Sequence, residues 1–248
     1  MVIFSVILCV NEDNPFLDKA IRSILVQDYN DFEFIIVANN CNDALYEKLE
    51  SYTEDKRIKL FRTIIGQLSF NLNFAINLSK GDYIIRMDSD DISLPNRLSK
   101  CNDLVIHEYD IIGFSVDLIN EQDEILGEQC LSDNKLANII YKNPFVHPAT
   151  MIKRSFLISC KGYLGGFQSE DYDLWIRAYR KGGVRTFFTK EKVLNYRIRN
   201  GQSRGNLLPY CEVASYFYRE LLLHPNLNNL ASFILATGKC IFYKFKLL

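Results

Sequence analysis

The stretch that decides the fold is "QLSFNLNFAINLSKGDYIIRMDSDD", residues 67–91. Its first part places Leu68, Leu72 and Ile76 at the spacing of one face of a helix. Its second part, "DYIIRMD", is an apolar run of strand length that ends in a cluster of acids. A helix followed at once by a strand and then by polar side chains is typical of one unit of an α/β sheet.

The same unit is repeated on the N-terminal side of this stretch. Residues 2–10 and 32–39 are runs rich in Val, Ile, Leu and Phe, as expected for strands covered on both faces. Helices are predicted at 15–27 and 43–53, and a short strand at 57–62. The alternation predicts an α/β fold with a Rossmann-like, mostly parallel central sheet flanked by helices. Ligands of such folds bind beyond the carboxyl ends of the strands.

The pattern is less regular after Pro95. A helix is predicted at 96–108, a strand at 110–119 and a helix at 133–141. The segments "VRTFF" and "KVLNYRIR" predict a pair of strands, and a helical C-terminus follows. No repeat or low-complexity linker separates these elements.

Composition excludes some classes of protein. The 248 residues carry 29 basic and 30 acidic side chains, so the net charge of −1 supplies no field that would recruit nucleic acid. Seven cysteines form no CxxC pair and make an odd number, which argues against a zinc ribbon and a disulfide framework. We therefore expect reduced thiols and a cytoplasmic protein. The apolar N-terminal run is too short to span a bilayer.

Asp88, Asp90 and Asp91 bring three like charges together after a strand. One interpretation is a solvated turn in which Asp90 or Asp91 caps the next helix. The other is a divalent cation site. The glycine and glutamate of an EF-hand are missing, and neither GxGxxG nor a Walker loop is present. The remaining kind of cation site is one for Mg²⁺ or Mn²⁺, in which one or two carboxylates and the phosphates of a substrate hold the ion.

A set of ordered motifs resembles bacterial glycosyltransferase family 2 over about residues 5–203: "SVILCVNEDNPFLDKAIRSILVQDY", "GDYIIRMDSDDISLPNRL", "NPFVHPATMIKRS", "SEDYDLWIRAYRKGG" and "VLNYRIR". The resemblance implies a GT-A fold and inverting transfer of a sugar from a nucleotide sugar. It implies a GT-A domain at 1–205, with a nucleotide-sugar-binding half at 1–92 and an acceptor-binding half at 93–205. Residues 206–248 would form a helical extension.

The resemblance also implies roles for the two acidic clusters. Asp88 and Asp90 would hold Mn²⁺ or Mg²⁺, with Asp90 as the direct ligand. In the later cluster Asp171 would be the general base for the acceptor hydroxyl, and Glu170 would orient or tune it. Asp173 is interpreted instead as part of the first turn of a helix, which Ser169 would cap.

The nucleotide-binding pattern departs from the family at the second strand. Many relatives have "VDDGSTD" there, whereas this chain has "VANNCND", so Ala38 cannot bind a base through its side chain. Asn39 or Asn40 would bind it instead, and uridine diphosphate is the preferred donor nucleotide. The residues expected to bind the nucleotide sugar are Val10, Glu12, Asn39, Asn40, Arg86, Asp88 and Ser89.

Several residues keep two interpretations. Arg86 and Arg97 either contact the pyrophosphate or form structural ion pairs, and Arg197 and Arg199 are further candidates for phosphate. His147, between the two prolines of "NPFVHPAT" that hold this loop extended, is either structural or lines the acceptor side. Together with Trp175 it is predicted to bind the acceptor.

The C-terminal tail has no acidic residue after Glu220 and mixes aromatic residues with lysines. It either packs on the domain or lies on an anionic inner membrane leaflet. The leading hypothesis is a transferase that adds one sugar to a lipid-linked or saccharide acceptor of a bacterial surface polysaccharide such as O-antigen or capsule. It would work in the cytoplasm or at the inner membrane. A nucleotidyltransferase and an inactive scaffold remain alternatives.

Overall fold

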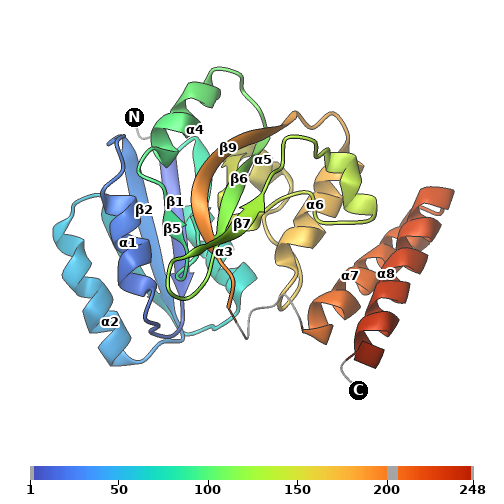
Figure 1. Ribbon diagram of the computed structural model, residues 1–248, viewed down its shortest axis with the longest axis horizontal. Coiled ribbons are helices and arrows are strands. Elements are labelled where there is room, and N and C mark those ends of the chain that lie inside the picture. The colour runs from blue at the N-terminus through green and yellow to red at the C-terminus, as the bar shows by residue number, and fades with distance from the viewer. Residues whose placement is uncertain (1–2, 200–205, 247–248) are drawn as a thin grey trace.

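The computed structural model describes residues 3–199 and 206–246. In this part of the chain the strands form one nine-stranded sheet, in the order β3-β2-β1-β4-β8-β6-β9-β5, with β7 paired to β6 (Figure 1). The strands are β1 (Phe4–Val10), β2 (Phe32–Asn39), β3 (Ile58–Thr63), β4 (Tyr83–Met87), β5 (Ile92–Ser93), β6 (Ile111–Ile119), β7 (Ile125–Gln129), β8 (Thr150–Lys153) and β9 (Thr186–Arg197).

The sheet is mostly parallel, as predicted. Strands β1, β2, β3, β4, β6 and β9 run in one direction, and β5, β7 and β8 run in the other. The first four strands are joined by helical crossovers, which parallel neighbours require. All eight residues of β2 are buried, which agrees with its run of apolar side chains.

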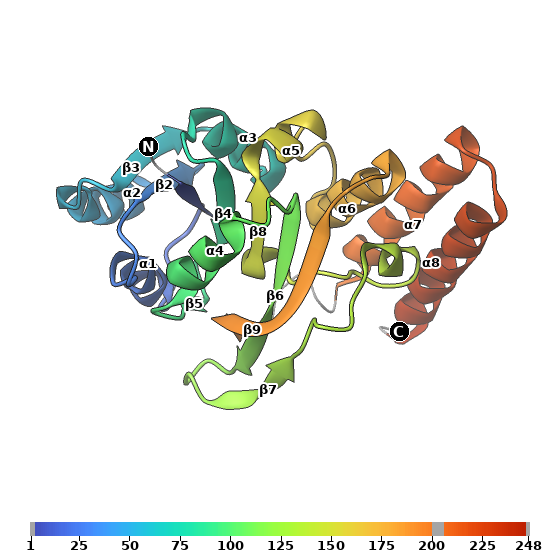
Figure 2. The same ribbon diagram turned by 90° about the horizontal axis from the view of Figure 1, so that it is seen from above.

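Helices cover the sheet. They are α1 (Leu17–Leu25), α2 (Asp43–Glu50), α3 (Leu68–Leu78), α4 (Arg97–Val105), α5 (Arg154–Ser159), α6 (Glu170–Lys181), α7 (Leu207–Leu223) and α8 (Leu227–Lys246), with 3₁₀ turns η1 (Ser51–Glu54), η2 (Leu136–Ile140) and η3 (His147–Ala149). Figure 2 shows α3 and α5 on one side of the sheet and α1 and α4 on the other.

The register of the parallel strands determines where the site lies. Val10 at the end of β1 pairs with Ala38 of β2, and Leu8 pairs with Met87 at the end of β4. The residues that follow these strands therefore emerge at one edge of the sheet. This edge carries the acidic cluster that begins at Asp88.

Two predicted elements were wrong. The two strands expected around "VRTFF" and "KVLNYRIR" are one strand, β9, in which an irregularity of register between Thr189 and Lys192 replaces the expected turn. The Ser115 hydroxyl donates to the carbonyl of Thr189 across this irregularity, at 2.8 Å. The helix expected at 133–141 is only the 3₁₀ turn η2, in which Ile139 alone is buried, so no amphipathic face stabilises a longer helix.

Helices α7 and α8 form a hairpin at the edge of the molecule, next to α6 and η2 (Figures 1 and 2). The described residues include no helix with the length and hydropathy that crossing a membrane requires.

Candidate active site

The acidic turn after β4 is held by the last residues of β9. Strand β5 pairs with β9 directly after the turn, which brings Arg197 beneath it. The Arg197 Nε donates to the carbonyl of Asp90 at 2.7 Å, and the Arg197 backbone N–H donates to Asp91 Oδ1 at 2.9 Å. The Arg199 Nε donates to Asp90 Oδ2 at 2.7 Å. The conformation of this turn therefore depends on a strand more than a hundred residues later in the chain.

These contacts show which of the two interpretations holds for Arg197, Arg97 and the acidic turn. Arg197 is fully buried, so it positions the turn and does not lie at a site for phosphate. Neither Asp90 nor Asp91 caps α4, whose N-cap position is Asn96. Arg97 is also fully buried and donates to the carbonyls of Arg86 and Pro148, which is a structural role.

The second acidic cluster forms the first turn of α6. Asp171 Oδ2 accepts a hydrogen bond from Asn143 Nδ2 at 2.8 Å, and Oδ1 accepts from the backbone N–H of Tyr172 at 2.7 Å. Burial raises the pKa of Asp171, and the bond from Asn143 opposes that rise. Burial also raises the pKa of Glu170, to about 7, although Arg86 opposes it.

Asp173 is fully buried and has a structural role, in agreement with its interpretation as a helix residue. It forms ion pairs with Arg177 of the same helix, at 2.7 Å, and with Arg219 of α7, at 2.8 Å. Ser169 stands at the N-cap position, but its side chain does not cap the helix. The Ser169 hydroxyl instead donates to the carbonyl of Pro209 at 3.4 Å, so the predicted cap was wrong.

Arg86 joins the two acidic clusters. Its Nε lies 2.8 Å from Asp88 Oδ1, and its Nη1 lies 3.3 Å from Glu170 Oε1. Burial alone would lower the pKa of Arg86, but the carboxylates of Asp88 and Glu170 raise it above its ordinary value. The guanidinium is therefore always charged, and both clusters belong to one site.

His147 also contacts the guanidinium of Arg86. Arg86 Nη1 contacts the Nδ1 atom of His147, whose Nε2 lies 2.7 Å from the Tyr163 hydroxyl. Burial and the charge of Arg86 lower the pKa of His147 well below its ordinary value. The ring is therefore neutral at neutral pH. A neutral ring that accepts at Nδ1 carries its proton on Nε2 and donates it to Tyr163.

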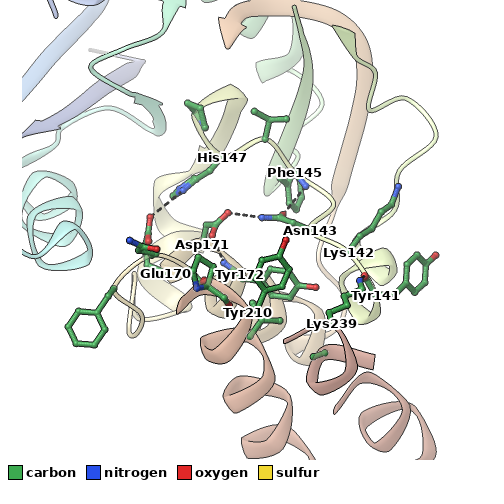
Figure 3. Close-up of a pocket in the computed structure, with 18 of the residues that line it drawn as sticks. Tyr141, Lys142, Asn143, Phe145, His147, Glu170, Asp171, Tyr172, Tyr210 and Lys239 are labelled. Atoms are coloured by element: carbon green, nitrogen blue, oxygen red, sulfur yellow. Dashed lines mark hydrogen bonds and ion pairs between the residues drawn. The ribbon is translucent and has the colours of Figure 1, made fainter. Parts of the chain in front are cut away.

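Two cavities meet at Arg86 and Asp88. The first, of about 500 Å³, lies at the ends of the parallel strands and is lined by Cys9, Asn11, Asn39, Ser89 and Asp90, among others. The second, of about 700 Å³, is lined by Asn143, His147, Glu170, Asp171, Tyr172 and residues of α7 and α8, among others. Figure 3 shows the residues of the second cavity, including Asp171 bonded to Asn143. Leu68 and Phe167 also line both.

Comparisons with known proteins identify the family of this chain. A family model described as glycosyl transferase family 2 matches residues 5–157. The chain is 42% identical over 235 residues to the O-antigen biosynthesis glycosyltransferase WbnJ of Escherichia coli, with 92% of each chain covered. The chain belongs to glycosyl transferase family 2.

Other relatives of this family 2 chain are more distant. It is 29% identical over 188 residues to the UDP-Gal:alpha-D-GlcNAc-diphosphoundecaprenol beta-1,3-galactosyltransferase of Escherichia coli, with 72% of this chain and 68% of the other covered. Among solved structures, S. aureus TarS 1–349 in complex with UDP-GlcNAc matches with a TM-score of 0.70 and 18% identity, over 97% of this chain and 81% of that chain.

The mannosyltransferase PcManGT from Pyrobaculum calidifontis, in complex with GDP-Man and Mn²⁺, matches with a TM-score of 0.67 and 13% identity, over 96% of this chain and 69% of that chain. At such identities the likeness concerns the fold. The sheet and its helices have the GT-A fold that was predicted.

Most of the predicted site residues of the family 2 chain line one or both cavities. They are Asn39, Arg86, Asp88, Ser89, Asp90, His147, Glu170 and Asp171. Asn39 is 4% exposed, and its Oδ1 has no hydrogen-bond partner in the described part of the chain. A buried acceptor in this position would suit a ring N–H of a nucleotide base.

Four predicted residues do not line either cavity. Val10 is buried in the core at the end of β1, while Glu12 and Asn40 are exposed. Trp175 is fully buried and packs against His147, with ring centroids 5.8 Å apart. It therefore supports the cavity wall from behind. Its burial follows from its place on the inner face of α6, beside the buried Leu174 and Ala178.

Sequence reasoning missed several residues of the site. Asn143 lies in the quoted segment "NPFVHPAT", where an amide before a proline gave a weak signal that was not followed. Tyr210 and Lys239 come from the C-terminal hairpin, and no local pattern marks them as cavity residues.

The residues near Asp88 fit a divalent cation only if substrate oxygens complete its shell. Among the described residues no group of three or more potential ligands could hold a metal by itself. Asp88 and Asp90 both line the smaller cavity, and their side chains are 27% and 11% exposed. Each of these carboxylates is ion-paired with an arginine, and two carboxylates beside a cavity are the donor set that Mg²⁺ or Mn²⁺ uses when it is shared with phosphates.

Asn143→Ala should shift the acid limb of the pH–rate profile to higher pH. The Asn143 hydrogen bond lowers the pKa of Asp171, so its removal raises that pKa, and a base works only when ionised. If the pKa of Asp171 rises by one unit, the rate at pH values below that pKa falls about tenfold. The measurement is kcat against pH, with Asn228→Ala on exposed α8 as the control. An unshifted limb would show that Asn143 does not tune the base.

Proposed function

We propose that this family 2 protein is a metal-dependent, inverting glycosyltransferase. It would move one sugar from a UDP-sugar to a lipid-linked or saccharide acceptor in O-antigen or capsule biosynthesis. The observation that carries the proposal is the ion-pair bridge through Arg86, which joins Asp88 of one acidic turn to Glu170 of the other. The two cavities meet at this bridge, as a donor site and an acceptor site of such an enzyme would have to.

The smaller cavity is assigned to the nucleotide sugar. Asn39 offers its unpaired Oδ1 to the base, and Asp88 and Asp90 face the place where a diphosphate would lie. A cation bound there would neutralise charge that develops on the leaving diphosphate. Uridine is preferred because TarS is seen with UDP-GlcNAc and one relative is named for UDP-Gal. Guanine also has a ring N–H, so competition by UDP and by GDP distinguishes the two bases.

The larger cavity is assigned to the acceptor. Its hydroxyl would attack the anomeric carbon from the face opposite to the diphosphate, so that one carbon–oxygen bond forms as the other breaks. The hydroxyl proton passes to the carboxylate of Asp171, which two hydrogen-bond donors hold in place. Arg86, fixed by His147 and Glu170, places a permanent positive charge between the two substrates.

The class of acceptor is inferred from the named relatives. WbnJ is named for O-antigen biosynthesis, and the galactosyltransferase is named for a diphosphoundecaprenol acceptor. A lipid-linked acceptor lies in a bilayer, so the proposed place of work is the cytoplasmic face of the inner membrane.

Product analysis tests the proposal. The protein is incubated with Mn²⁺, a panel of UDP-sugars and lipid-linked or short saccharide acceptors. We expect release of UDP and a product whose anomeric configuration is inverted. Release of pyrophosphate would identify a nucleotidyltransferase instead, and a lack of turnover and of donor binding across the panel would indicate a scaffold.

A further inference from the structure

Helix α8 presents an exposed apolar stripe along its whole length. Its members recur at intervals of three, four, seven and four residues, which keeps them on one side of a helix: Leu227, Leu230, Ile234, Ile241 and Phe245. Phe242 lies beside the stripe and is 71% exposed. At about 1.5 Å per residue the stripe is about 27 Å long. Ser232 and Ala236, on the other side of the helix, are buried.

The charged residues of α8 are all lysines. Lys244 flanks the stripe at 100° per residue, whereas Lys239 lies toward the side of the helix that carries Ser232 and Ala236; both lysines are exposed. No acidic residue follows Glu220 in the sequence. An apolar face flanked by Lys244, on a helix whose charged residues are all lysines, is the pattern of a helix that lies in the interface of an anionic membrane.

The same helix forms a wall of the acceptor cavity. Leu235, Ala236 and Lys239 of α8 line the larger cavity, together with Tyr210 and Val213 of α7. The Lys239 ammonium donates to the carbonyl of Tyr141 at the cavity wall, as the labelled residues of Figure 3 illustrate. One face of α8 therefore borders the acceptor site, and another is exposed to the surroundings.

We propose that the apolar stripe of α8 docks on an anionic lipid bilayer and places the acceptor cavity at the membrane surface. The proposal deepens the proposed function, on which it rests for the lipid-linked acceptor. A second copy of the chain fits the stripe less well, because two such helices would bring lysines together with no carboxylate on either helix to pair with them.

Vesicle sedimentation of the full chain tests this surface. We expect the protein to bind vesicles of mixed phosphatidylcholine and phosphatidylglycerol, and to bind phosphatidylcholine vesicles much more weakly. The triple substitution Ile241→Ser, Phe242→Ser and Phe245→Ser should reduce the bound fraction at least about tenfold, since it removes most of the apolar surface at one end of the stripe. Lys244→Glu should weaken binding to the mixed vesicles only, and added salt should do the same.

A matched control removes apolar surface elsewhere. Ile64, Ile106 and Ile125 are 91%, 81% and 70% exposed and lie outside α8, so their replacement by Ser should leave vesicle binding unchanged. Circular dichroism and Tm of each variant show that it is folded. If the control and the α8 variant lost binding equally, or if neither lost it, the proposal would be overturned.

Transfer to a short water-soluble acceptor separates this inference from the proposed function. We expect the α8 triple variant to keep that activity. Activity of the unaltered protein without vesicle binding would overturn the docking surface and leave the function in place. Vesicle binding without any sugar transfer would overturn the proposed function and leave the docking surface in place. Sedimentation velocity adds a further outcome: a dimer without lipid that the triple substitution converts to a monomer would assign the stripe to a second copy.

Discussion

Asp171→Asn should reduce the rate of sugar transfer by about 10²–10⁴-fold, which is the usual contribution of a general base. Asparagine keeps the shape of the side chain and its one amide oxygen can still accept either from Asn143 or from the Tyr172 N–H, but it cannot take a proton. The donor cavity does not include Asp171, so the affinity for UDP-sugar should stay within about twofold. Transfer of radiolabelled sugar gives the rate, and isothermal titration gives the affinity.

Glu170→Gln is the matched comparison. Glu170 lies in the same turn but contacts Arg86 and His147, at 3.3 and 3.7 Å, and is thereby engaged in positioning. Its loss should lower kcat less than Asp171→Asn does. If Glu170→Gln removed transfer while Asp171→Asn retained it, the two roles would be exchanged.

Asp90→Asn should abolish Mn²⁺ binding in the presence of UDP and lower transfer by about 10³-fold, because a cation on the leaving diphosphate supplies several kcal/mol of charge stabilisation. Among the residues that the structure describes, only Asp88 and Asp90 line the smaller cavity as acids, so the loss of one carboxylate leaves a single charged ligand. The number of bound Mn²⁺ ions is counted by electron paramagnetic resonance, independently of activity. Removal of metal by a chelator should reproduce the loss of transfer, and added Mn²⁺ should restore it in the unaltered protein only.

Asp91→Asn is the control for this experiment. Asp91 is 1% exposed, and its Oδ1 accepts the backbone N–H of Arg197, a bond that the amide oxygen of asparagine retains. Mn²⁺ binding should therefore persist in Asp91→Asn. Equal Mn²⁺ affinity of Asp90→Asn and the unaltered protein would contradict the assignment of Asp90 as a ligand.

Much of the fold could be predicted because its signals are local. Runs of apolar residues mark β1, β2 and β4 as buried strands, and helical spacing marks α1 and α3 between parallel neighbours. The two acidic clusters that begin at Asp88 and Glu170 could also be predicted, since each cluster is contiguous in the chain. Predictions were wrong in the second half, at β9 and η2, where short elements depend on contacts with distant segments more than on their own pattern.

The amino-acid sequence by itself determined the alternating α/β order, the parallel half of the sheet and the two carboxylate clusters, because these depend on side-chain periodicity within a few residues. Only the tertiary structure decided how the clusters meet. Arg86 bridges them, Arg197 supports one turn, Asn143 bonds the candidate base, and α8 lines the larger cavity. These contacts join residues tens to more than a hundred positions apart, and such pairs leave no periodic signal in a single sequence.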